Sequence, residues 1–209
     1  SWIVLGEGFR ESSLVQLIER TFDILASLGL LVVALPVMLL TAVAIRIEDG
    51  WRAPVFYRQS RVGRYNEPFQ ILKFRSMREN AEEDGAVWAL PRDPRITKVG
   101  AIIRKTRIDE LPQLINVLRG DMSFVGPRPE RPEFVEQLSR ALPYYRSRHA
   151  VKPGITGWAQ LCYPYGSSTD DAFEKLQYDL YYVKHRSLIL DLAIVVQTVE
   201  VVLWGKGAR

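Results

Sequence analysis

The feature that most constrains this sequence is an apolar run from Ile24 to Ile45. Its 22 residues include no charged side chain, and about 20 such residues in a helix cross the roughly 30 Å hydrocarbon core of a bilayer. A core helix of a globular protein would normally be shorter and would show one polar face. The run is also too long for a signal peptide and lacks a small-residue cleavage pattern. We therefore predict a helix inserted in a membrane.

Pro36 lies near the middle of this run. Proline lacks an N–H and clashes with the preceding turn, so the helix must kink or break there. Arginines flank the run on both sides, at Arg10, Arg20, Arg46, Arg52, Arg58, Arg61 and Arg64. They place its C-terminal side inside the cell but do not clearly place its N-terminal side outside. A helix that returns to the same membrane face and a kinked helix that crosses the bilayer fit these residues equally well.

The rest of the chain reads as an α+β domain that is mainly helical. Two apolar-aromatic runs, 54–59 and 69–74, flank the polar sequence RVGRYNE and predict a β-hairpin. The sequence KPGITGW at 152–158 predicts a turn. Helical spacing of apolar residues, or a polar helix end, predicts helices near 80–85, from about 109 to a stop at Gly120, and over 134–148, 174–185 and 188–204. The last of these fits an amphipathic helix on a membrane surface and an ordinary core helix.

Length and charge limit the classes of function. The 209 residues suffice for one domain, and the formal net charge of +4 indicates an anionic partner such as a nucleic acid, an anionic lipid or a phosphorylated substrate. Cys162 is the single cysteine and there are two histidines, so an intrachain disulfide is excluded and a zinc site of Cys and His is disfavoured. A nucleic-acid binder would explain the charge but not the apolar run.

Two adjacent acids, Asp109 and Glu110, stand out because they follow a strongly basic segment. Pro112 is tolerated in a first helical turn, which predicts a helix that begins near Asp109. Acids in a first turn commonly just complement the helix dipole. The basic neighbours favour a further role, since they keep carboxylates ionised and can neutralise a phosphate. They are Arg92, Arg95, Lys98, Arg104, Lys105 and Arg107, against the single acid Asp93.

These residues together suggest phosphate chemistry at a membrane. An ionised Asp109 can attack phosphorus, and the membrane helix allows the acceptor to be a lipid phosphate. Lys73, Arg75 and Arg128 are candidates for the remaining phosphates, although each alone is more often a surface charge. With neither a His/Cys cluster nor a third neighbouring acid, we expect a hard cation, Mg²⁺ with Mn²⁺ as a substitute, held partly by substrate oxygens and water.

Five blocks of sequence make the chain recognisable. They are KFRSM (73–77), DPRIT (93–97), RKTRIDELPQLINVLRGDMSFVGPRPE (104–130), KPGITGWAQ (152–160) and YDLYYVKHRSLILDL (178–192). In this order, across about residues 18–204, they resemble the bacterial sugar transferase family. Its members are monotopic polyprenyl-phosphate hexose-1-phosphate transferases, also called phosphoglycosyl transferases. RIDELPQL and PRPERPEFV are most similar to the exopolysaccharide subgroup.

The resemblance implies a ping-pong reaction between a UDP-sugar and polyprenyl (undecaprenyl) phosphate. Asp109 matches the family's nucleophile and Mg²⁺ ligand, and Glu110 the second acid of the pair. Arg104 matches a phosphate-binding arginine. Arg128 and Asp179 fall in the Pro-Arg-Pro and Asp-x-Tyr-Tyr motifs, which we assign to substrate or phosphate binding with Lys73 and Arg75.

The family further implies a re-entrant membrane helix broken at a Ser-Pro pair, which here is Leu35-Pro36. We accordingly expect residues 1–49 to form an N-terminal segment with this helix. Residues 50–209 should form a catalytic domain on the cytoplasmic face of the bacterial inner membrane, as the C-terminal part of a longer protein. Membrane lipids and a homodimer are the other expected partners, with no nucleic acid. The rival hypothesis is a non-catalytic membrane scaffold that binds anionic lipids, which leaves Asp109 and Glu110 unexplained.

Overall fold

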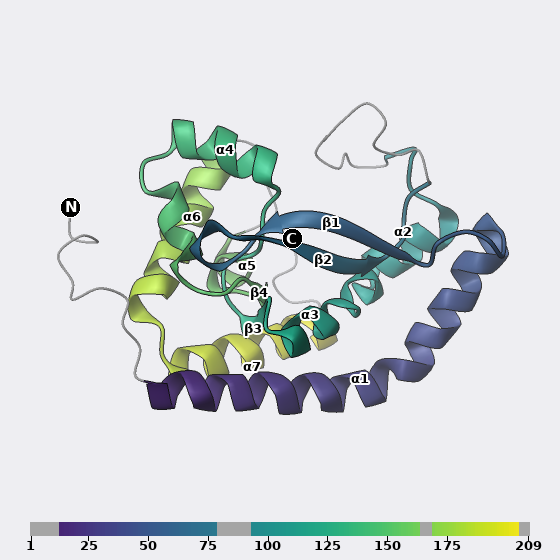
Figure 1. Cartoon of the computed structure of the whole chain (residues 1–209), viewed down its shortest axis with the longest axis horizontal. Coiled ribbons are helices and arrows are strands. Elements are labelled where there is room, and N and C mark those ends of the chain that lie inside the picture. The colour runs from purple at the N-terminus through teal and green to yellow at the C-terminus, as the bar shows by residue number, and fades with distance from the viewer. Residues whose placement is uncertain (1–12, 79–92, 164–168, 205–209) are drawn as a thin grey trace.

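The computed structural model describes residues 13–78, 93–163 and 169–204. Helix α1 (Ser13–Asp49) runs along one face, and the other elements form an α+β, mainly helical body beside it (Figure 1). In chain order the body contains β1 (Phe56–Val62), η1 (Arg64–Asn66), β2 (Pro68–Phe74), α2 (Lys98–Lys105), η2 (Ile108–Glu110), α3 (Gln113–Arg119), β3 (Ser123–Val125), α4 (Pro132–Ala141), η3 (Tyr145–Ala150), β4 (Gly154–Thr156), α5 (Trp158–Cys162), α6 (Thr169–His185) and α7 (Leu188–Trp204). The helix end predicted at 80–85 lies outside the described residues.

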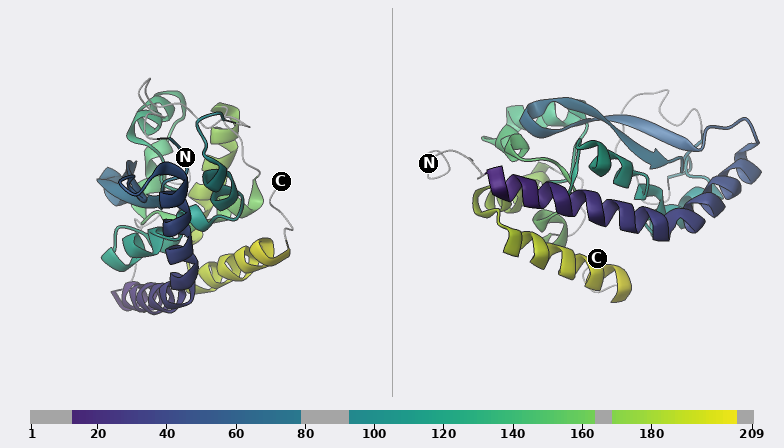
Figure 2. Two further views of the ribbon diagram at one scale, coloured as in Figure 1. Left: turned by 90° about the vertical axis from the view of Figure 1, so that its right-hand side faces the viewer. Right: turned by 60° about the horizontal axis from the view of Figure 1, so that its bottom comes forward.

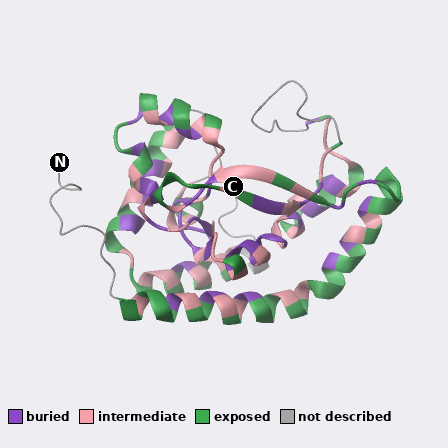
Figure 3. Cartoon of the chain, viewed as in Figure 1, coloured by how far each residue is buried: buried purple, intermediate pink, exposed green. Residues whose placement is uncertain are grey.

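Helix α1 bends but does not break at Pro36. It is one helix of 37 residues that contains the proline, and its axis changes direction along its length (Figure 1). A proline removes one backbone hydrogen bond and kinks a helix, while the turns on either side can continue. In its most apolar 18-residue window only 11% of the residues are buried, and exposed positions recur along its outward side (Figure 3). The helix is therefore not a core helix, and its length and composition suit a bilayer.

Both ends of α1 are held to the same body by side-chain caps. Near its N-terminus, Arg20 donates to two carbonyls at the C-terminal end of α3, both at 2.6 Å. One turn later, Asp23 accepts from the side chain and backbone at the start of β3, both at 3.0 Å. At the other end, Glu48 accepts from the first two N–H groups of α2 at 2.7 and 2.8 Å. The positive charge of Arg20 complements the C-terminal end of α3, and the negative charge of Glu48 complements the N-terminal end of α2. The apolar stretch of α1 therefore begins and ends on one side of the body.

The predicted hairpin is confirmed by the antiparallel strands β1 and β2, which pair from Phe56 opposite Phe74 to Val62 opposite Pro68. The free edge of β2 is joined to α3 by Asn116. The side chain of Asn116 accepts from the N–H of Leu72 at 2.9 Å and donates to the carbonyl of Gln70 at 2.8 Å. Because Asn116 satisfies these backbone groups, the middle of α3 is fixed beside the middle of β2.

Two predicted segments between residues 134 and 158 differ from the structure. The helix expected over 134–148 ends at Ala141, because Pro143 follows and disfavours a helical residue before it; the chain continues in the separate 3₁₀ segment η3. The turn expected at 152–158 contains the short strand β4, which pairs in parallel with β3. The prolines and glycines in these segments indicate where a helix or strand ends. They do not predict that residues 154–156 will pair with the distant strand β3.

Helix α7 has the predicted bounds and an apolar stripe that faces away from the body. Ile189, Leu192, Val196 and Val199 lie three or four residues apart and are exposed, whereas Ile194 is fully buried on the opposite side. This exposure does not fit a fully buried core helix, and the position of α7 on a membrane surface stays a prediction. Helices α1 and α7 lie along the same face of the molecule, opposite the hairpin (Figures 1 and 2).

Candidate active site

Asp109 and Glu110 lie in the 3₁₀ turn η2 rather than at the start of an α-helix. Arg107 takes a left-handed conformation with φ 59°, which ends the helical path of α2, and α3 begins only at Gln113, after Pro112. The expected helix start near Asp109 is therefore wrong. A left-handed residue with a Cβ costs about 1–2 kcal/mol, and its position beside the two acids makes this turn a local constraint on them.

Glu110 is the centre of an ion-pair cluster. Arg128 approaches it in a two-point contact at 2.5 and 3.4 Å, and Lys73 lies 3.3 Å from one of its oxygens. Arg107 adds a contact at 3.8 Å. Burial alone would raise the pKa of Glu110, but the charges of Arg128 and Lys73 outweigh it and hold the pKa well below its usual range. Glu110 is therefore ionised and organises the cations around it.

Asp109 is different, although it is the neighbouring residue. It is 9% exposed, and its Oδ1 atom is buried with no hydrogen-bond partner among the described residues. Burial raises its pKa above the ordinary value, and the charge of Glu110 raises it further, against the opposing charges of Lys73, Arg104 and Arg107. From the sequence, the nearby cations were expected to lower the pKa of both acids. For Asp109 the effect of burial is larger than that of the cations, and its pKa is raised instead. An unsatisfied buried carboxylate oxygen in a native site calls for a ligand.

The raised pKa of Asp109 predicts where activity is lost at low pH. If Asp109 must be ionised to react, kcat/KM falls as the pH drops through this pKa, so the limb should lie above the ordinary value of 3.8. The measurement is kcat/KM against pH at constant Mg²⁺, with circular dichroism to confirm folding at each pH. A limb at or below the ordinary value would contradict the effect of burial.

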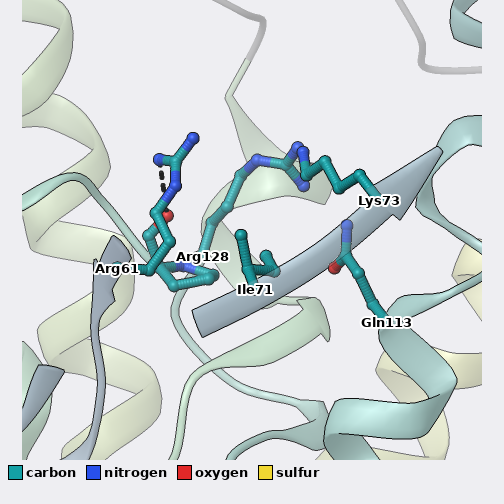
Figure 4. A pocket seen from close by; sticks show the side chains of 6 residues that line it. Arg61, Ile71, Lys73, Gln113 and Arg128 are labelled. Atoms are coloured by element: carbon teal, nitrogen blue, oxygen red, sulfur yellow. Dashed lines mark hydrogen bonds between the residues drawn. The ribbon is translucent and has the colours of Figure 1, made fainter. Parts of the chain in front are cut away.

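A small pocket of about 10 Å³ beside Glu110 gathers polar side chains from separate elements (Figure 4). Lys73 comes from β2, Gln113 from α3, Arg61 from β1 and Arg128 from the proline-rich loop after β3. Gln113 is 1% exposed, and in the part of the chain that the structure describes its Nε2 atom has no hydrogen-bond partner. Donors of this kind suit phosphate oxygens. The lining is completed by Ile71 and Pro129.

Sequence reasoning missed Arg61 and Gln113. A signal for Gln113 was present, because it follows Asp109 by four residues and therefore returns to the same side of a helical segment. Arg61 was counted only as a membrane-flanking charge. Its place in the pocket depends on the hairpin register and on a hydrogen bond to the carbonyl of Pro129 at 3.1 Å, neither of which local sequence specifies.

The structure brings together most of the predicted site residues. Asp109, Glu110, Lys73 and Arg128 form one cluster, and Arg104, in the last turn of α2, acts on Asp109 through its charge. Two predicted residues have other contacts. Arg75 pairs with Asp49 at the end of α1 at 2.8 Å. Asp179 is buried on α6 in an ion pair with Arg148.

The acids of the site fit a weakly coordinated hard cation. Among the described residues there is no group of three or more His, Cys, Asp or Glu side chains that could enclose a metal. Asp109 has a buried oxygen without a partner, whereas Glu110 is occupied by cations. One carboxylate with substrate phosphates and water is a common environment for Mg²⁺. Asp109 is accordingly the residue that would hold it.

Comparison with known proteins identifies the family. The model of the bacterial sugar transferase family matches residues 14–205. The chain belongs to this family. The match covers α1 together with the body, including every residue of the pocket described above. The resemblance based on the five sequence blocks is thus confirmed.

Three relatives illustrate the similarity. The chain is 49% identical over 198 residues to the UDP-N-acetylgalactosamine-undecaprenyl-phosphate N-acetylgalactosaminephosphotransferase of Aeromonas hydrophila, covering 95% of this chain and 46% of that one. It is 40% identical over 192 residues to the UDP-glucose:undecaprenyl-phosphate glucose-1-phosphate transferase of Escherichia coli K12, covering 90% and 40%. It is 40% identical over 200 residues to the exopolysaccharide production protein PSS of Rhizobium leguminosarum bv. phaseoli, covering 91% and 98%. The chain thus spans less than half the length of the first two.

Proposed function

We propose that this chain transfers a sugar 1-phosphate from a UDP-sugar to polyprenyl phosphate, giving polyprenyl-diphospho-sugar and UMP. The observation that carries the proposal is the buried carboxylate oxygen of Asp109, which has no partner among the described residues, in a chain that also has a cationic pocket and a bilayer-length helix. The names of the Aeromonas and Escherichia relatives support it, since both act on a UDP-sugar and undecaprenyl phosphate. The exopolysaccharide relative supports a role in exopolysaccharide or glycan assembly.

In the first half-reaction, a carboxylate oxygen of Asp109 attacks the sugar-bearing phosphorus of the UDP-sugar. The new bond joins this oxygen to phosphorus. The bond from phosphorus to the oxygen bridging the two phosphates breaks, and UMP leaves with that electron pair. Arg104, Lys73 and Arg128 offset the charge on the phosphate oxygens. Glu110 holds the latter two cations in place and, with its low pKa, is suited to this task rather than to proton transfer.

In the second half-reaction, a phosphate oxygen of the polyprenyl phosphate attacks the same phosphorus. The Asp109–phosphorus bond breaks, Asp109 returns as a carboxylate, and the phosphosugar leaves on the lipid. The two substrates use one nucleophile in turn, which is ping-pong kinetics. The amide nitrogen of Gln113, which has no partner among the described residues, is a further donor for phosphate oxygens in either step.

Mg²⁺ bound by Asp109 would supply charge neutralisation of the phosphates. We predict that EDTA abolishes UMP release and that Mg²⁺ or Mn²⁺ restores it, because one carboxylate binds the metal weakly and a chelator removes it. The measurement is UMP release after dialysis against EDTA, with Ca²⁺ as the comparison ion. Full activity in chelator would show that the cations alone neutralise the phosphates.

We place α1 as a re-entrant helix on the cytoplasmic face of the bacterial inner membrane, and its caps support the return of both ends to one side. Arg20 and Glu48 lie at opposite ends of the apolar stretch, yet both bind the same body. A helix that crossed the bilayer would have to break one set of these polar contacts. The bend at Pro36 lets α1 enter and return, and the exposed apolar stripe of α7 lies on the same face. The bilayer is thereby proposed to cover both helices.

This topology predicts that both ends of α1 stay on the inside. In a Cys162→Ser background, single cysteines are introduced as Ser13→Cys and Arg52→Cys, at exposed positions beyond the two sets of caps. An impermeant thiol reagent applied to spheroplasts should label neither, and permeabilised cells should label both. Labelling of Ser13→Cys in intact spheroplasts would favour a kinked spanning helix instead.

The experiment that tests the function is a donor screen. The protein in lipid nanodiscs is incubated with Mg²⁺, polyprenyl phosphate and one UDP-sugar at a time, and UMP is measured. At least one donor should give UMP together with a lipid-linked sugar diphosphate. No UMP with any donor, with anionic lipid binding intact, would favour the scaffold.

A further inference from the structure

A buried arginine outside the pocket holds the backbone of a residue that lines it. Arg148 in η3 is 5% exposed. Its Nε and Nη2 atoms donate to Oδ2 of Asp179 at 2.9 and 2.6 Å. Nη2 also donates to the carbonyl oxygen of Arg128 at 3.0 Å, and Nη1 contacts the hydroxyl of Tyr145 at 3.3 Å. One guanidinium thereby joins η3 and α6 to the loop that carries Arg128.

The loop around Arg128 needs such an anchor. Pro127 and Pro129 flank Arg128 and have no N–H, so this segment cannot take part in a regular hydrogen-bond ladder. The carbonyls at its two ends accept from backbone N–H groups, Pro127 from Gly154 at 3.1 Å and Glu130 from Val62 at 2.9 Å. The two carbonyls between them accept from arginine side chains, Pro129 from Arg61 at 3.1 Å and Arg128 from Arg148. The Arg128 side chain then reaches Glu110 from this fixed backbone.

We propose that Arg148, oriented by Asp179, is a positioning residue for the transfer reaction: it fixes the main chain of Arg128 so that the Arg128 guanidinium meets Glu110 and the phosphates. Asp179 then acts from behind the site and does not touch the substrate. A purely stabilising ion pair is the alternative, but a buried pair contributes little net stability compared with apolar residues of similar volume. The pair's third bond, to the main chain of a pocket residue, distinguishes the two explanations.

The first test is a double-mutant cycle. Arg148→Lys keeps the charge but cannot bind Asp179 and the Arg128 carbonyl with the same geometry. In the wild-type background it should lower kcat by about 10²-fold, the scale of a misplacement near 1 Å. In an Arg128→Lys background, which retains a cation, the same change should cost much less, since the group it positions has been replaced. Equal losses in both backgrounds would overturn the proposal.

A second readout needs no turnover, so it separates this inference from the proposed function, on which the kinetic test rests. In protein labelled with ¹⁵N-arginine, the Nε–H signal of Arg128 is assigned by its loss in Arg128→Lys. Arg148→Lys should shift and broaden this signal. Tyr145→Phe removes only the hydroxyl that contacts Arg148, so it should shift and broaden the Arg128 signal less than Arg148→Lys does. It should slow the reaction by about fivefold, the equivalent of one hydrogen bond.

The matched control is Arg146→Lys. Arg146 lies two residues before Arg148 in η3 and pairs with Glu136 on the surface at 2.6 Å. This variant should leave both the rate and the Arg128 signal unchanged. An Arg128 signal that stays as in the wild type in Arg148→Lys and Tyr145→Phe would show that Arg148 is a structural residue only.

Discussion

Asp109→Asn is expected to lower UMP release by a factor on the order of 10⁴ or more, the scale seen when a nucleophilic site loses a member. Asparagine keeps the size of the side chain but lacks the anion that attacks phosphorus. Both half-reactions use this residue, so neither UMP nor the lipid product should form. The measurement is single-turnover UMP release with excess protein, in nanodiscs.

The same substitution should not destabilise the fold. Burial raises the pKa of Asp109, so its charged form is disfavoured in the folded protein, and its contribution lowers stability as the pH rises through that pKa. At neutral pH the neutral asparagine removes this penalty, and the free energy of unfolding should stay the same or rise. Loss of activity with an unchanged or higher unfolding midpoint is the expected combination. Near-normal turnover would end the covalent hypothesis.

Glu110→Gln is expected to reduce both activity and stability. It leaves Arg128 and Lys73 partly buried without their carboxylate, and breaking one side of a buried ion pair costs about 3–5 kcal/mol. The cations should also move from the pocket, so kcat should fall with the free energy of unfolding. Denaturant unfolding in detergent and UMP release measure the two effects. Asp109→Asn is the matched control, because it changes the adjacent acid without breaking this cluster.

The stability difference should depend on pH in a defined direction. Because the folded-state pKa of Glu110 is depressed below the unfolded value of 4.5, its contribution is fully present above that value and is lost as the pH falls through the folded-state pKa. The difference in unfolding free energy between wild type and Glu110→Gln should therefore shrink in acid. A difference that is constant, or grows toward low pH, would contradict the assigned role of Glu110.

Local sequence predicted the hairpin and α7 because each depends on short-range patterns, whereas of the pocket lining it named only Lys73 and Arg128. The alternating runs around RVGRYNE specify the two strands, and the apolar spacing of 188–204 specifies a helix. The start of α3 was missed, because the backbone from Ile108 onward first forms i→i−3 bonds, from Leu111 to Ile108 and from Leu114 to Leu111. Pro112 has no N–H to donate to the carbonyl of Ile108, so α-helical bonding begins only after it.

Contacts between distant segments account for the remaining differences. Asp179 is separated from Arg148 by 31 residues, and its burial turns a motif acid assigned to substrate into the partner of an arginine that sequence reasoning did not consider. Arg75 is similarly occupied by Asp49. For α1 the sequence identified the apolar run and the effect of Pro36, but the caps at Arg20 and Glu48 depend on how the body folds beneath the helix.

The measurement that tests the central claim most directly is isolation of the covalent intermediate. Protein in nanodiscs is mixed with a productive UDP-sugar and Mg²⁺ in the absence of polyprenyl phosphate, quenched and analysed by peptide mass spectrometry. We predict a burst of UMP no larger than the amount of protein, and a sugar-phosphate adduct on the peptide that contains Asp109. The adduct should disappear when polyprenyl phosphate is added and should be absent from Asp109→Asn. Lipid-linked product formed without any adduct, and UMP released only after polyprenyl phosphate is added, would instead show direct transfer between the two substrates.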